Sequence, residues 1–257
     1  MAGVGVGTAL LPQVTGALIG AVGWRGAYIG LAVLLLVIVV PVLLFVIREP
    51  ARRTARAATE EGLTAAQAIR TRTFWILAAA FFLLAVTAAG LTAHIVPLLT
   101  DRGVAPQQAA GVISVIGIAL IVGRLVAGYL LDRVFAPYVA VAFTVLPLVG
   151  VVLLLVAVNV PTAIVAALLV GLGLGAEVDL IAFLLSRYLG MRAFGEIYGY
   201  LFALFMLGNG VGPVVLGTSF QSTGSYTPAL VACAVGLVIA SGLVLRLGPY
   251  RYTAARS

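Results

Sequence analysis

The stretch GRLVAGYLLDR, residues 123–133, ends an apolar run that begins near Ala105 and is long enough to cross a membrane as a helix. Along that helix, at ~1.5 Å of rise per residue, Arg124 lies roughly 12 Å from Asp132. A hydrocarbon core of ~30 Å then places Arg124 near the midplane. A cation at this depth costs at least ~2.5 kcal/mol to insert, so it normally faces a cavity, a partner or a substrate. The stretch therefore predicts a membrane-spanning helix with a functional arginine.

The composition of the whole chain is that of a membrane protein. Hydrophobic residues make up 63% of the 257 residues and charged residues only 9%, with a mean hydropathy of +1.22. A soluble domain has about 25% charged residues, so this chain could not cover a surface that faces water. The net charge of +7 does not indicate nucleic acid as a partner, because the basic residues stand at the ends of apolar runs. We predict an integral membrane protein.

The sequence offers little from which to build a catalytic site. It contains one histidine, His94, and one cysteine, Cys233, which excludes a disulfide framework and a cysteine metal site. No group of potential ligands has the spacing of a metal-binding motif. We therefore expect neither an enzyme nor a bound cofactor or metal.

Eight apolar runs are long enough to be membrane-spanning helices. We predict them at residues 3–22, 26–47, 74–99, 106–131, 136–157, 161–185, 194–217 and 227–247. The polar stretch 48–73 interrupts them. Within it, Thr64-Ala-Ala-Gln67 is typical of a capping box at the start of a short helix.

The arginines predict how these helices are oriented. Alternate helix ends carry twelve of them, whereas the opposite ends carry only Arg25 and Arg102. The twelve are Arg48, Arg52, Arg53, Arg56, Arg70, Arg72, Arg133, Arg187, Arg192, Arg246, Arg251 and Arg256. By the positive-inside rule their side is cytoplasmic, and no basic segment of a removable signal peptide follows Met1. We expect a multi-pass protein of the inner (plasma) membrane, with loop 48–73 and the C-terminus in the cytoplasm.

A repeat at an offset of 201 residues relates the start of the chain to its end. Gly7, Pro12, Gly16 and Gly23 recur as Gly208, Pro213, Gly217 and Gly224. The repeat unit then contains six helices, and residues 1–47 are the last two helices of a unit that lacks its first four. We predict three parts: these two helices of an N-terminal half, a central cytoplasmic loop at 48–73, and a complete six-helix half at 74–257.

Four motifs carry a resemblance to a known family. Gly128-x-x-x-Asp132-Arg133 resembles the second copy of the cytoplasmic loop motif of the major facilitator superfamily. The stretches 23–28, 94–103 and 177–199 are similar to bacterial monocarboxylate transporters and oxalate/formate-antiporter-like members. The superfamily is built from two six-helix repeats. The resemblance implies an all-α membrane protein with this fold and about eight transmembrane helices.

The resemblance also implies a function. We expect a secondary transporter that moves a small organic anion such as a monocarboxylate, with protons, by alternating access. Family members that carry dianions add a lysine on the helix corresponding to 194–217, where this chain has no cation. A monoanion is therefore the better match. We expect the missing N-terminal helices, or another copy of the chain, to be needed for transport. The alternatives are efflux of an amphipathic compound and a non-transporting membrane fragment.

Arg124 is the first candidate site residue. A guanidinium fits a carboxylate through two parallel hydrogen bonds, and the resemblance adds that family members place a substrate-binding arginine on this helix. The alternative is an ion pair between helices, with Glu177 or Asp179 as the partner. Tyr198 and Asn209 are further candidates to line the substrate site, with ordinary helix packing as the alternative.

Three residues are candidates for proton coupling: Glu177, Asp179 and His94. Because Glu177 and Asp179 are two residues apart, their side chains point to nearly opposite faces of their helix. At most one of them faces the cavity, and the other should meet a neighbouring helix. His94, toward the outer end of its helix, is either a gate or proton relay or a hydrogen-bonded interhelical residue.

Five residues at the cytoplasmic side are candidates for a gate: Gly128, Asp132, Arg133, Arg187 and Arg192. The resemblance makes Asp132 a latch to the adjoining helix. Its partner would be the helix start near Arg192–Ala193, where the helix dipole favours an anion. The alternative is that Asp132 is simply solvated in its loop.

Overall fold

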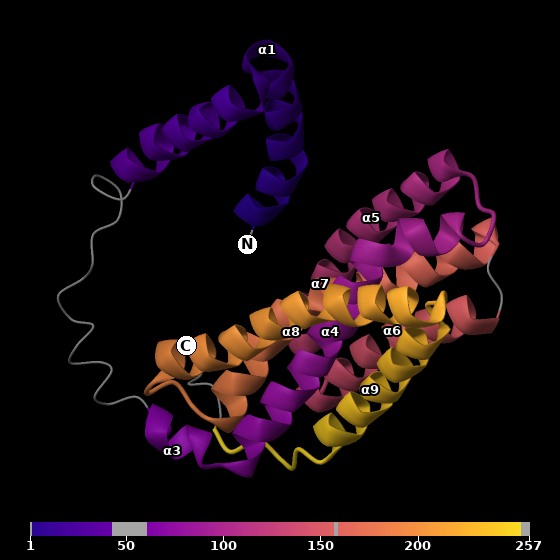
Figure 1. Cartoon of the computed structure of the whole chain (residues 1–257). Helices are drawn as coiled ribbons and strands as arrows, with labels where there is room; N and C mark the ends of the chain where they lie inside the picture. The colour runs from indigo at the N-terminus through magenta and orange to yellow at the C-terminus, as the bar shows by residue number, and fades with distance from the viewer. Residues whose placement is uncertain (1, 43–60, 157–158, 253–257) are drawn as a thin grey trace. The chain divides into compact units, whose positions relative to one another are not determined.

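The computed structural model describes residues 2–42, 61–156 and 159–252 (Figure 1). These residues are helical apart from turns and a single β-bridge between Gly62 and Gly190. The chain divides into two compact units, Met1–Arg56 and Ala57–Ser257. The predicted all-α class is confirmed.

The described residues of the first unit form one helix with a sharp break. Helix α1 (Ala2–Pro41) is interrupted at Gly23, where φ is +71° and ψ is 173°. Glycine adopts a positive φ at no steric cost, so the predicted turn at this position is confirmed. Gly224, the counterpart of Gly23 in the sequence repeat, ends α8 with φ +66°. Both glycines have a positive φ, but ψ is 173° at Gly23 and 14° at Gly224, so the two copies of the repeat share the position of the helix break and not its backbone conformation. The predicted helix end at 43–47 lies outside the described residues.

Where the structure describes it, the second unit is a bundle of six long helices preceded by one short helix, α3 (Ala65–Ile69). The long helices are α4 (Arg72–Thr100), α5 (Pro106–Leu131), α6 (Ala136–Val156), α7 (Val160–Tyr188), α8 (Phe194–Thr223) and α9 (Thr227–Leu245). In the described part of the chain, these six and Leu18–Pro41 are long and apolar enough to cross a membrane. The sequence predicts two such helices within residues 3–47, whereas the described residues of this region contain one candidate span, Leu18–Pro41.

Helix α7 occupies a central place in the bundle. It packs between α5 and α6, while α4 packs against α8 and α9, and α9 also contacts α6 (Figure 1). The capping box at the start of α3 is confirmed, since Thr64 N donates to Gln67 Oε1 at 3.0 Å and Gln67 N donates to Thr64 Oγ1 at 3.3 Å. This part of the chain is also tied to the α7–α8 turn, because Leu63 N donates to Leu189 O at 2.9 Å.

Glycines let the backbones of α5 and α7 approach closely. A Cβ atom on Gly175 would collide with the carbonyl oxygen of Leu120, and one on Gly123 with that of Leu172. Gly171, one turn before Gly175, also lies against the backbone of α5. Small residues four apart are the usual means of close helix packing in membranes. These glycines therefore determine where along their length α5 and α7 contact each other.

We predict that Gly175→Ala destabilises the bundle, because the added methyl group meets backbone that cannot move aside. Overpacking of this kind typically costs about 1–3 kcal/mol. The measurement is thermal unfolding in detergent micelles. Gly117→Ala on α5 is the matched control, because its Cβ would meet nothing within 4 Å. Equal stability of the two variants would contradict the predicted backbone contact.

Candidate functional site

The close approach of α5 and α7 brings two opposite charges together. A Cβ on Gly175 would lie 2.7 Å from Arg124 N, so the arginine backbone rests directly against α7. One turn further along α7, Asp179 Oδ2 lies 3.4 Å from Arg124 Nε. Both side chains are 24% exposed. The structure therefore forms the interhelical ion pair that the sequence leaves open as an alternative, with Asp179 as the partner of Arg124.

This ion pair leaves most of the guanidinium free to bind something else. Arg124 Nε is buried and makes no hydrogen bond, and in the described ranges the terminal nitrogens have no acceptor either. A guanidinium has five N–H donors in a planar fork, and two of them match the two oxygens of a carboxylate. Arg124 can therefore accept a second anion while it remains beside Asp179.

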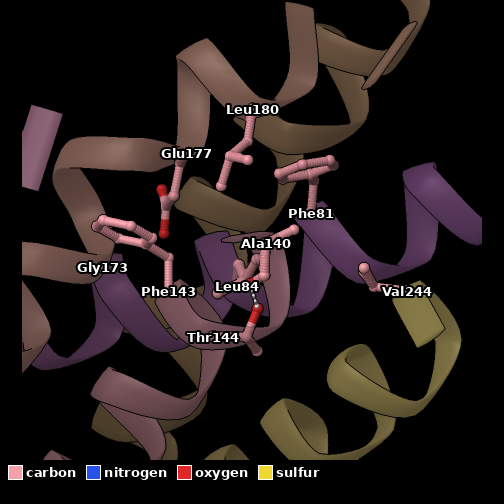
Figure 2. A pocket seen from close by; sticks show the side chains of 9 residues that line it. All are labelled: Phe81, Leu84, Ala140, Phe143, Thr144, Gly173, Glu177, Leu180 and Val244. Atoms are coloured by element: carbon pink, nitrogen blue, oxygen red, sulfur yellow. Dashed lines mark hydrogen bonds between the residues drawn. The ribbon is translucent and has the colours of Figure 1, made fainter. Parts of the chain in front are cut away.

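The two acids of α7 lie in different surroundings, as their spacing predicts. Asp179 faces α5 and Arg124, whereas Glu177 is 4% exposed and lines a small cavity against α4, α6 and α9 (Figure 2). The structure brings Asp179, and not Glu177, to the arginine.

A strip of stacked aromatic rings runs along α8. Phe194 and Tyr198 stack with centroids 5.9 Å apart and planes at 12°, and Tyr198 and Phe202 at 5.6 Å and 15°. Tyr198 lies close enough to Asp179 to interact with its charge. Sequence reasoning selects Tyr198 and misses the two phenylalanines, although their spacing of four residues is a signal for one helix face.

Asn209 is the other candidate on α8. Its Nδ2 donates to the carbonyl oxygen of Phe205, one turn earlier on the same helix, at 3.0 Å. The side chain is half-buried and this donor is used within α8. A role for Asn209 in substrate binding stays a prediction.

His94 joins three segments of the bundle. Its Nε2 lies 3.0 Å from the carbonyl oxygen of Pro213 on α8, and its Nδ1 lies 3.3 Å from the hydroxyl of Tyr226. Because a carbonyl oxygen only accepts, Nε2 carries the hydrogen, and Nδ1 of the neutral ring accepts from the tyrosine. Burial, and secondly the charge of Asp101, raise the pKa of Tyr226, which keeps its hydroxyl protonated. These contacts are those of a hydrogen-bonded interhelical histidine, which is one of the two alternatives that the sequence leaves open. A role of His94 in gating or proton relay stays a prediction.

Two of the candidate gate arginines pack on aromatic rings. The Arg133 guanidinium lies 3.7 Å from the ring centroid of Tyr129 on its own helix. That of Arg187 lies 5.0 Å from the ring of Phe183 and 5.6 Å from the ring of Tyr250 in the C-terminal segment. Both contacts are within the range of cation–π attraction.

The expected latch between Asp132 and the start of α8 is not formed. Asp132 is exposed and, among the residues that the structure describes, its side chain has no bonded partner, while the N-cap of α8, Ala193, provides no side-chain cap. The physical reason is the packing order, since α5 lies mainly against α7 and α8 mainly against α4. Gly128 borders open space and Arg192 is exposed. The structure does not bring the five gate candidates into one cluster.

The sequence of the chain matches the family model of the Major Facilitator Superfamily over residues 1–213. The chain belongs to the Major Facilitator Superfamily. This is a family of transporters, not of enzymes, and the resemblance deduced from the motifs is confirmed.

Two curated relatives of this superfamily are similar to most of the chain. Human monocarboxylate transporter 12 is 27% identical over 183 residues, which cover 66% of the chain and 34% of that protein. The uncharacterized MFS-type transporter YhjX of Escherichia coli (strain K12) is 29% identical over 166 residues, which cover 63% of the chain and 40% of the relative. The chain thus spans less than half the length of the relatives it matches, and it is related to monocarboxylate transporters.

A solved transporter shares the fold of the chain. The E. coli fucose:proton symporter FucP superposes with a TM-score of 0.67 at 13% identity, over 93% of this chain and 60% of that one. At this identity the match shows the fold alone. The predicted superfamily fold is confirmed.

Proposed function

We propose that the chain is part of a secondary transporter for a small organic monoanion, such as a monocarboxylate, and that it carries a proton with each anion. The observation that supports this function is the half-buried pair of Arg124 and Asp179, with the terminal nitrogens of the guanidinium free of acceptors among the described residues. The name of the human relative, a monocarboxylate transporter, favours a carboxylate as the ligand.

The charges of this site explain why binding of a monoanion would be coupled to uptake of a proton. Arg124 and Asp179 together are neutral. A carboxylate that binds the free side of Arg124 places two anions beside one cation, away from bulk water, and like charges at such distances cannot both remain ionised without cost. Uptake of one proton by Asp179 restores neutrality. A dianion would leave one negative charge uncompensated even then, so the site favours monoanions.

Alternating access requires this six-helix unit to move against other helices. Among its spans, α8 and α5 are the least buried. In the most apolar 18-residue stretch of each helix, 28% (α8) and 29% (α5) is buried. Of the candidate spans in the described residues, α8 is also the least apolar, which does not suit a surface wholly covered by lipid. We infer that upstream helices, or another copy of the chain, cover these faces in the working transporter.

The aromatic strip of α8 supports a second candidate function. Stacked rings beside a single ion pair also suit an amphipathic compound with an apolar body, which such a transporter would export. Neutral amphipathic compounds therefore belong in every substrate panel beside monocarboxylates.

We further propose that loop 48–73 and the C-terminus lie in the cytoplasm of a cell whose inner membrane the chain crosses. The support is the uneven distribution of the arginines over the helix ends. Single cysteines test this orientation in a background where the buried Cys233 is replaced by alanine. Ser222→Cys should react with a membrane-impermeant thiol reagent added to intact cells. Arg70→Cys and Arg251→Cys should react only after the membrane is opened; their reaction in intact cells would refute the orientation.

The substrate role of Arg124 predicts specific losses of transport. Losing a hydrogen bond to a charged group costs ~1.5–3 kcal/mol, and ~1.4 kcal/mol is a factor of ten in affinity. Arg124→Ala should therefore weaken anion binding at least about tenfold, and Arg124→Lys should give an intermediate defect because it keeps the charge without the fork. Binding and uptake are measured in proteoliposomes, with the chain or a form that extends further upstream. Normal affinity of Arg124→Ala for every tested anion would remove Arg124 from the substrate site.

Variants of Asp179 separate an anchor from a purely structural ion pair. If Arg124 only neutralises Asp179, the double variant Arg124→Ala/Asp179→Ala should regain what the single arginine variant loses. An anchor predicts no such rescue. Asp179→Asn alone should still exchange anions across the membrane but lose accumulation driven by a pH gradient, and unchanged accumulation would exclude Asp179 as the coupling acid.

A further inference from the structure

A second ionisable group lies inside the six-helix bundle, on the other side of α7 from the ion pair. Glu177 is 4% exposed and lines a small cavity (Figure 2). The walls are mainly apolar and include Phe81 and Leu84 of α4, Leu180 of α7 and Val244 of α9. This cavity and its carboxyl group are separate from Arg124 and Asp179.

The carboxyl group of Glu177 has no charged neighbour in this cavity. Within the described ranges it makes neither an ion pair nor a hydrogen bond, and the lining residues from α4, α6 and α9 carry no titratable group. The hydroxyl of Thr144 donates its hydrogen to the carbonyl oxygen of Ala140 at 2.7 Å, so it is not free to donate to the carboxylate. Burying an ionised carboxylate without a partner is expensive, whereas the neutral acid needs only one acceptor. The surroundings therefore favour the protonated form.

The neighbouring helix offers a suitable acceptor. Pro147 has no N–H group, so the carbonyl oxygen of Phe143, four residues earlier on α6, lacks its usual helical donor. That oxygen lies against α7 at Gly173, where a Cβ atom would be only 3.1 Å away. Gly173 is one turn before Glu177, and helical side chains lean toward the N-terminus. In Figure 2 the carboxyl group accordingly points toward Phe143.

We propose that Glu177 and the Phe143 carbonyl form a buried proton-binding site between α7 and α6. The carboxylate binds one proton and, as the neutral acid, donates it in a hydrogen bond to the carbonyl oxygen, directly or through one water molecule. No other bond changes in this step. A bound metal cation is a poor alternative, because hard cations require about six or more oxygen ligands. The proposal depends on neither the substrate nor the coupling role of Asp179.

The site has a consequence for the packing of the bundle. Loss of the proton leaves an unpaired charge in an apolar cavity and removes the hydrogen bond across the α6–α7 contact. The arrangement of helices described above therefore holds this proton, and a conformation that releases it must admit water to Glu177 or separate α6 from α7.

Infrared difference spectroscopy of the whole chain in lipid tests the protonation directly. At neutral pH the wild type and Asp179→Asn should both show the carbonyl stretch of a protonated carboxylic acid, and Glu177→Gln should lose it. Replacing sodium by choline should leave the band unchanged. Absence of any band that depends on Glu177 would overturn the proposal, and so would its loss on addition of sodium.

A double-mutant cycle tests the partner of the acid. Pro147→Ala returns a backbone N–H to the Phe143 carbonyl, so the acid is no longer needed as its donor. Glu177→Leu should therefore lower the unfolding temperature more in the wild-type background than in the Pro147→Ala background. Glu177→Gln, whose amide can still donate, should lose less than Glu177→Leu. Equal decreases in unfolding temperature in both backgrounds would refute the Phe143 carbonyl as the partner. If Glu177→Leu does not fold, the infrared test still applies, because it uses only the conservative variant Glu177→Gln.

Discussion

The contact of bare backbone between α5 and α7 positions the ion pair of Arg124 and Asp179 in the membrane part of the bundle. Gly123 and Gly175 allow the two helices to touch without side chains between them. Arg124 follows Gly123 directly, and Asp179 stands one turn after Gly175, so the two charges meet as a result of the contact. A wider helix separation would leave a cation and an anion each exposed to lipid, which is expensive at this depth. The close packing at the glycines thus also determines that Arg124 and Asp179 form an ion pair.

Helix α7 gives its two acids different chemistry by facing two different neighbours. Asp179 lies beside a cation and is half-buried, which supports the proposal that it exchanges a proton as an anion binds Arg124. Glu177 faces an apolar cavity between α4, α6 and α9, where a proton is the simplest partner. The first site suits transport, and the second suits the packing of α6 on α7. The aromatic strip of α8 is near the first site at Tyr198, which interacts with the charge of Asp179.

The sequence predicts the membrane class and the break at Gly23, because helix length, hydropathy and glycine conformation are local properties. The superfamily fold is predicted by the resemblance of four motifs and not by these local properties. The opposite directions of the two acids also follow from helix geometry. The choice of Asp179 as the partner of Arg124 depends on which helices pack together, and the sequence alone leaves it open. The contact between His94 and Tyr226 spans 132 residues and has no local signal. Contact between Asp132 and the start of α8 likewise depends on the packing order of the helices, and in this structure α5 lies mainly against α7 and α8 mainly against α4.

In the proposed transport step, the neutral pair of Arg124 and Asp179 takes up one monoanion together with one proton. The most direct measurement is the dependence of uptake on membrane potential in proteoliposomes, with the pH gradient held constant. Electroneutral uptake predicts that the initial rate for a monocarboxylate is the same at positive, zero and negative potential, and that a concentration jump of the substrate produces no sustained current. A sustained current, or a rate that changes with the sign of the potential, would contradict the claim.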